Sequence, residues 1–103
     1  KYWEDRKPYL NPEFKITDMA RDLVSNRTYI SAFINREYGV NFNRFINSYR
    51  LKEVERLHAD AVQRKQKIPV LEIVLHAGFS NYRSYFRAKN MVKNEAVAIN
   101  QKM

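Results

Sequence analysis

The scarcity of chain-breaking residues is the feature that most constrains the fold. The 103 residues include two glycines and three prolines. An all-β domain of this length needs many tight turns, which glycine and proline usually supply, so the composition favours helices. Apolar residues make up 45% of the chain and charged residues 29%, as in a globular rather than a disordered protein. We therefore expect one compact helical domain over residues 1–103.

Two short amphipathic segments at residues 16–39 predict a helix-turn-helix unit. We expect Thr17 to cap the first helix, and Ser25 or Asn26 to cap the second. Gly39 then ends the second helix, because glycine readily adopts the left-handed conformation that follows many helices. The apolar positions expected to face inward recur at helical spacing: Ile16, Met19, Ala20, Leu23, Ile30, Phe33, Ile34 and Tyr38.

The longest periodic segment, residues 42–61, predicts a linker helix. At about 1.5 Å per residue it would be roughly 30 Å long. Residues 1–9 are expected to form a short helix or cap that ends near Pro8, and residues 93–103 a frayed or disordered tail. The residues expected in the core, without a functional role of their own, are Phe33, Ile34, Phe45, Ile46, Tyr49, Val54, Leu57, Ile73 and Val74.

Residues 69–92 predict a second helix-turn-helix unit. Pro69 suits the first turn of a helix, and Gly78 ends that helix. Ser80 or Asn81 is then placed to cap the last helix.

The second unit is an internal echo of the first. Ala20 corresponds to Val74 at an offset of 54 residues, and Asn35 corresponds to Asn90 at an offset of 55. The extra residue falls in the turn region. A linker of roughly 30 Å is close to the ~34 Å repeat of B-DNA, so both second helices could enter adjacent major-groove segments.

The charge balance indicates a polyanionic partner. The formal net charge is +8 and the isoelectric point is about 9.9. Nucleic acid and acidic membrane surface are the usual partners of so basic a domain. Both second helices are rich in exposed amide, hydroxyl and guanidinium groups, which can bind base edges or phosphates. We therefore favour double-stranded DNA over two alternatives, a protein-interaction module that binds an acidic partner and a membrane-surface helix.

Four stretches of the sequence resemble the AraC/XylS family of bacterial transcription regulators. They lie at residues 16–23, 29–39, 42–51 and 72–81, and the resemblance extends over roughly residues 12–89. Its most specific pieces are the Gly39-Val40-Asn41-Phe42 step, the Arg50-Leu51 pair and the Ala77-Gly78-Phe79-Ser80 turn.

The resemblance implies an all-α, homeodomain-like fold of about six to seven helices, with two helix-turn-helix units joined by a linker helix. It also implies sequence-specific DNA binding as the output domain of a cytoplasmic transcription factor that activates transcription by contacting RNA polymerase. Such domains normally follow a sensor or receiver domain, so we expect a longer regulator.

The position of each residue within the family motif assigns candidate DNA contacts. The base-reading candidates are Thr28, Ser31, Asn35, Tyr82, Arg83, Phe86 and Arg87. Ala32 shares this surface but can contact only a thymine methyl. The phosphate-binding candidates are Asn26, Arg27, Arg36, Arg44, Asn81 and Lys89. For Arg36, and also for Arg50, a structural ion pair is an equal alternative.

Other function classes have little support in the sequence. The chain has no cysteine, which fits a reducing cytoplasmic setting and excludes thiolate metal sites. His58 and His76 lack carboxylate partners at ligand spacing, so we expect no metal. No catalytic triad or glycine-rich phosphate loop is apparent, so we expect neither an enzyme nor a cofactor.

Overall fold

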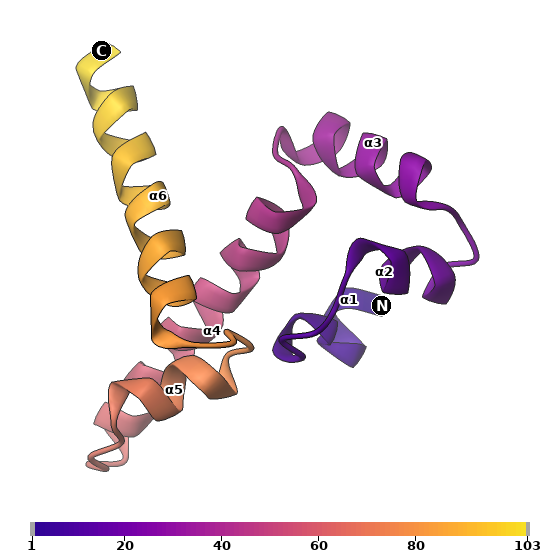
Figure 1. The fold of residues 1–103 in the computed structure, drawn as a ribbon. Coiled ribbons are helices and arrows are strands. Elements are labelled where there is room, and N and C mark those ends of the chain that lie inside the picture. Colours follow the sequence, from indigo (N-terminus) through magenta and orange to yellow (C-terminus); the bar gives the residue numbers. More distant parts are fainter. Residues whose placement is uncertain (1, 103) are drawn as a thin grey trace.

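All regular structure in residues 2–102 is helical. The computed structural model describes the backbone of these residues and the side chains of residues 2–93 (Figure 1). The elements are α1 (Tyr2–Arg6), the 3-10 helix η1 (Pro8–Leu10), α2 (Ile16–Asp22), α3 (Arg27–Tyr38), α4 (Phe42–Gln63), α5 (Val70–His76) and α6 (Tyr82–Lys102). The predicted all-α fold of about six helices is confirmed.

Helix α4 runs through the middle of the molecule. Figure 1 shows α2 and α3 on one side of α4, with α5 and α6 on the other. Helices α3, α5 and α6 and the 3-10 helix η1 all pack against α4. Its 22 residues make it about 33 Å long. Among the described residues, no helix is both long and apolar enough to span a membrane.

Asparagine side chains cap the N-termini of three helices. The Oδ1 atoms of Asn26, Asn41 and Asn81 accept hydrogen bonds from the backbone N–H three residues ahead, at 2.8, 2.9 and 2.8 Å. These bonds satisfy N–H groups that have no partner within the helix. At both predicted turns, therefore, the asparagine rather than the preceding Ser25 or Ser80 is the cap.

The start of α2 differs from the prediction. Thr17 is not its N-cap, because the helix already begins at Ile16, after the extended residue Lys15. The carboxylate of Asp18 accepts a hydrogen bond from the backbone N–H of Lys15 at 2.8 Å. A negative charge in the first turn also interacts favourably with the positive end of the helix dipole, so Asp18 rather than Thr17 stabilises the start of α2.

Two helices extend beyond their predicted ends. Helix α4 continues to Gln63, and α6 continues to Lys102 instead of ending near Val92. Residues 93–103, which we expected as a frayed or disordered tail, contain no glycine or proline to stop a helix. Residue 103 and the side chains of residues 94–103 lie outside the described residues.

The apolar side chains form two separate cores along α4. The first surrounds Trp3, whose ring lies 5.1 Å from that of Phe45 and 5.3 Å from that of Tyr49, measured between centroids. The second contains Val54, Ile73, Val74, Ala77, Phe79, Tyr85 and Ala88. Each helix-turn-helix segment therefore has its own core, and α4 contributes to both.

Most of the residues predicted to face the core are buried or half-buried. Two of the positions predicted to face inward are exposed instead. Tyr38 is 54% exposed and Leu23 is 41% exposed. Tyr38 lies in the last turn of α3, where its ring packs at a tilt against the ring of Phe45, with 4.8 Å between centroids. Leu23 is the residue after α2, so it no longer follows the helical periodicity that we extended to it.

Candidate nucleic-acid interface

The first helix of each helix-turn-helix segment ends with the same hydrogen-bond pattern and a residue of positive φ. After α2, Val24 has a positive φ of 51°, and the N–H of Ser25 donates to the carbonyl of Ala20 at 2.8 Å. After α5, Gly78 has a φ of 104°, and the N–H of Phe79 donates to the carbonyl of Val74 at 3.3 Å. This is the Schellman arrangement of a helix C-terminus, repeated at an offset of 54 residues.

The helices that follow the turns also begin alike. Asn26 and Asn81, 55 residues apart, cap α3 and α6 through the backbone N–H groups of Tyr29 and Ser84. The next inward positions, Ile30 and Tyr85, are 4% and 9% exposed. The internal repeat in the sequence therefore corresponds to a structural repeat: both units have the same type of turn, the same asparagine cap and a buried residue at the same position.

The first turns of α3 and α6 have no acidic side chain. Helix N-termini carry partial positive charge and unpaired N–H groups, and phosphates bind readily there. Between residues 82 and 93, α6 has four basic residues and no acidic one. Its exposed surface is therefore electrostatically suited to a polyanion.

The outward surface of α3 brings together the candidates assigned to the first unit. Thr28, Ser31 and Asn35 are exposed and line an open depression together with Ala32, Arg27 and Arg36. The hydroxyl and amide groups can bind base edges, whereas the methyl of Ala32 offers an apolar contact only.

The outward surface of α6 is more aromatic and more basic. Tyr82 and Phe86 are 48% and 50% exposed, and their rings are stacked with centroids 6.4 Å apart. Arg83 and Arg87 lie beside them and are also exposed. The surface combines guanidinium groups, which can bind guanine in a bidentate manner, with apolar groups that can contact thymine methyls.

The phosphate candidates differ in how their polar atoms are engaged. Asn26 and Asn81 accept a hydrogen bond at Oδ1 as helix caps, and their amide NH₂ groups are the donors that a phosphate could use. Arg36 Nε lies 3.7 Å from Glu37 Oε1 at the surface. Arg44 is half-buried and already in contact with other groups.

The remaining two phosphate candidates are exposed at the edges of the two helices. Arg27 is the first residue of α3. Lys89 places its Nζ 5.8 Å from the centroid of the Tyr85 ring, a cation–π distance that orients the amine on α6. Both can reach a phosphate beside their helix.

Arg50 is buried against backbone carbonyls instead of being exposed to a phosphate, and it makes no ion pair with the described residues, contrary to both expectations. It is 9% exposed, and its guanidinium donates to the carbonyl of Tyr9 at 2.7 Å and to that of Asn11 at 2.9 Å. Burial lowers the pKa of the Arg50 guanidinium from its usual value. The acceptors are about forty residues distant in the chain, so no local sequence pattern could have indicated them.

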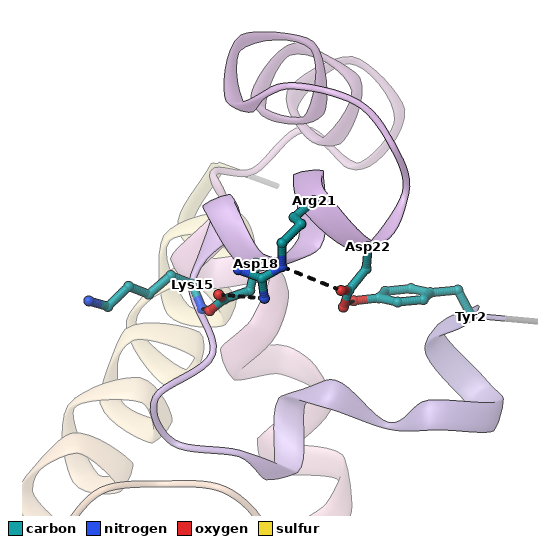
Figure 2. A network of polar contacts seen from close by, with 5 residues as sticks. All are labelled: Tyr2, Lys15, Asp18, Arg21 and Asp22. Carbon is teal, nitrogen blue, oxygen red and sulfur yellow. Dashed lines mark hydrogen bonds and ion pairs between the residues drawn. The ribbon is translucent and has the colours of Figure 1, made fainter.

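A polar network on α2 of the first unit includes one hydrogen bond to α1 (Figure 2). The Tyr2 hydroxyl donates to Asp22 Oδ2 at 3.0 Å, and Arg21 lies 3.1 Å from Asp18 Oδ1. Desolvation, followed by the hydrogen bond to Asp22, raises the pKa of Tyr2 from 10.0 to about 12. The bond of Asp18 to the Lys15 backbone lowers the pKa of that carboxyl, with a smaller contribution from Arg21. The network ties the N-terminal helix to the first helix-turn-helix segment.

One of the two histidines borders the candidate surface of α6. His58 lines an open groove between α4, α5 and α6, which Tyr82 and Lys89 also line. His76 Nε2 is 3.9 Å from Glu72 Oε1, so the expectation that His76 lacks a carboxylate partner is wrong. Among the described residues, no three histidine or acidic side chains come together in a way that would hold a metal ion.

Comparisons of the chain with protein-family models, with curated proteins and with solved structures found no match.

Proposed function

We propose that this chain is a sequence-specific, double-stranded-DNA-binding domain that reads adjacent major-groove segments with α3 and α6. The observation that carries the proposal is the repeated turn and cap. The bonds to Ala20 and Val74, followed by the caps Asn26 and Asn81, twice lead into a helix with an exposed polar surface. That arrangement is typical of the recognition helix in a helix-turn-helix.

The two proposed reading surfaces differ in chemistry. In α3 the small groups of Thr28, Ser31 and Asn35 would bind few base edges, and Ala32 adds no hydrogen bond. In α6, Arg87 is long enough to reach O6 and N7 of one guanine. We therefore assign most of the base discrimination to the second unit, with Arg87 as its main contributor.

The length of α4 supports simultaneous binding by both units. About 33 Å of helix separates its ends, close to the ~34 Å between successive turns of one groove on B-DNA. A single chain would then cover an asymmetric site of roughly two turns from one side of the duplex. The net charge of +8 would supply the salt-dependent part of the affinity.

The resemblance to AraC/XylS regulators supports a more specific role. On that basis the domain is the output part of a bacterial, cytoplasmic transcription regulator, works without a cofactor and is no enzyme. RNA polymerase and a sensor or receiver domain of the same protein are its proposed further partners.

A competition experiment separates DNA from the other polyanions. A fluorescent pool of random duplexes is bound at about 0.15 M salt and challenged with unlabelled duplex, anionic phospholipid vesicles or polyglutamate. We expect only duplex DNA to displace the labelled pool at matched charge concentration. Equal displacement by vesicles or by polyglutamate would favour a membrane-surface or protein-interaction role and would contradict the proposal.

A further inference from the structure

Three segments that are distant in the sequence meet at one point between the two cores. They are η1 with the following Asn11, the middle of α4 at Arg50, and the turn at Gly78 between α5 and α6. Tyr9 of η1 belongs to the first core, and Phe79, next to Gly78, belongs to the second. We call this contact of Tyr9, Asn11, Arg50 and Gly78 the junction.

Arg50 contributes a buried charge to the junction. Its Nε donates to the Tyr9 carbonyl and its Nη2 to the Asn11 carbonyl, at 2.7 and 2.9 Å. A buried guanidinium is costly unless its donors are satisfied. Moving η1 away from α4 would remove these acceptors at once, so the charge opposes that movement.

At the junction, the backbone of Gly78 lies close to Tyr9, Leu10 and Arg50. A Cβ at this position would lie closer to the Tyr9 carbonyl oxygen than real Cβ atoms come to any neighbour, and 3.0 Å from both Arg50 Nε and Leu10 Cα. Only a residue without a side chain lets the second turn rest directly on η1 and on Arg50. The positive φ of 104° also favours glycine here, because residues with a Cβ rarely adopt it.

The junction is an attachment between the units in addition to α4. A helix alone can bend and twist along its length, and each core packs on a different part of α4. Contact of the Gly78 turn with η1 fixes the second unit at another point, away from the helix axis. Rotation of the second unit about α4 would break this contact.

We infer that Arg50 and Gly78 form a clamp that fixes the orientation of the second helix-turn-helix unit relative to the first. This clamp rests on the proposed function and restricts the DNA substrate to two half-sites at one fixed spacing and one helical phase. Arg50 is a positioning residue here and does not itself touch DNA.

A distance measurement between spin labels tests the clamp without DNA. The chain has no cysteine, so labels at Glu37→Cys on α3 and Met91→Cys on α6, both exposed positions, are unique. We expect a narrow distance distribution in the otherwise unchanged chain and a broadened one with Arg50→Met. Arg50→Lys keeps a cationic donor and should give an intermediate width. Equal widths in all three folded proteins would overturn the clamp.

The two glycines provide a matched pair of variants. Gly39 and Gly78 both have positive φ, but a Cβ at Gly39 meets nothing within 4 Å. Gly39→Ala therefore controls for the backbone strain of a positive φ. Gly78→Ala has that strain too, and its Cβ also clashes with the Tyr9 carbonyl at the junction. Broadening with Gly78→Ala but not with Gly39→Ala supports the clamp, whereas equal distributions contradict it.

A spacing series then connects the clamp to DNA. Two base pairs inserted between the half-sites turn one relative to the other by roughly 70°, since B-DNA has about 10.5 base pairs per turn. We expect the insertion to weaken binding by the unchanged chain at least about tenfold, and binding by Arg50→Met less than about threefold. Equal weakening in both proteins would overturn the clamp but leave the proposed function intact. Absence of duplex binding would overturn the proposed function, while the spin-label result would still decide the clamp.

Discussion

Asn26 and Asn81 lie 55 residues apart, and the Oδ1 atom of each accepts the same hydrogen bond, from the backbone N–H three residues ahead at 2.8 Å. Each follows a Schellman turn and starts a helix whose outward surface we assign to DNA. The pair therefore connects the internal echo of the sequence with the two proposed reading helices.

The first prediction concerns these caps. Asn26→Ala and Asn81→Ala should each lower the free energy of unfolding by about 1 kcal/mol, because a backbone N–H loses its partner. Urea unfolding followed by circular dichroism measures the change. Asn43→Ala, at an exposed position inside α4, is the control and should stay within about 0.5 kcal/mol. Equal effects at all three positions would contradict the role of the caps.

Arg87 is expected to discriminate between bases. Arg87→Ala should weaken binding to the preferred duplex by about 1–3 kcal/mol and leave binding to random duplex nearly unchanged, because a bidentate contact to guanine is lost. Fluorescence anisotropy on both duplexes measures the two affinities. Arg64→Ala, in the connector after α4, is the charge-matched control. Equal losses on both duplexes would make Arg87 a phosphate contact.

Phe86 is expected to contact thymine. It has no hydrogen-bonding group, is 50% exposed and lies between Arg83 and Arg87 on α6, so a thymine methyl is the base feature that it can bind. Replacing thymine by deoxyuridine in the second half-site should weaken binding by the unchanged chain. The same replacement should have little effect on Phe86→Ala. A uracil effect of equal size in both proteins would show that another residue makes the contact.

Deprotonation of Tyr2 should lower the free energy of unfolding at alkaline pH. Its pKa is raised to about 12 in the folded chain from 10.0, mainly by desolvation and then by Asp22, so the folded state retains the proton more tightly. This stabilisation is complete below pH 10 and is lost as the pH rises through about 12. Tyr2→Phe should therefore give a shallower loss of unfolding free energy between pH 10 and 12. Tyr29→Phe, at an exposed position, is the control for the loss of a tyrosine hydroxyl. An equally shallow curve in both variants would contradict the role of Tyr2.

The local structure was largely predictable from the sequence. Caps such as Asn26, and the left-handed turn at Gly39, depend on residues within a few positions of one another, and short-range patterns describe them well. The errors at Thr17 and at the end of α6 concern boundaries, where a competing acceptor or the lack of a stop signal decides.

The long-range structure was not predictable in the same way. Arg50 looked like a surface charge because its acceptors, the carbonyls of Tyr9 and Asn11, are backbone atoms that any residue type could provide. Gly78 was expected to end a helix, but its contact with η1 depends on the tertiary fold. Side-chain patterns cannot indicate such pairs, although a basic residue on a mostly apolar stripe of α4 was a weak signal.

Selection of bound duplexes from a random library, at two salt concentrations, tests the central claim most directly. We predict a recovered motif with two short blocks about one helical turn apart that persists at the higher salt. Recovery of unselected duplexes, with binding that disappears at the higher salt, would mean that the net charge alone acts and would contradict sequence reading by α3 and α6.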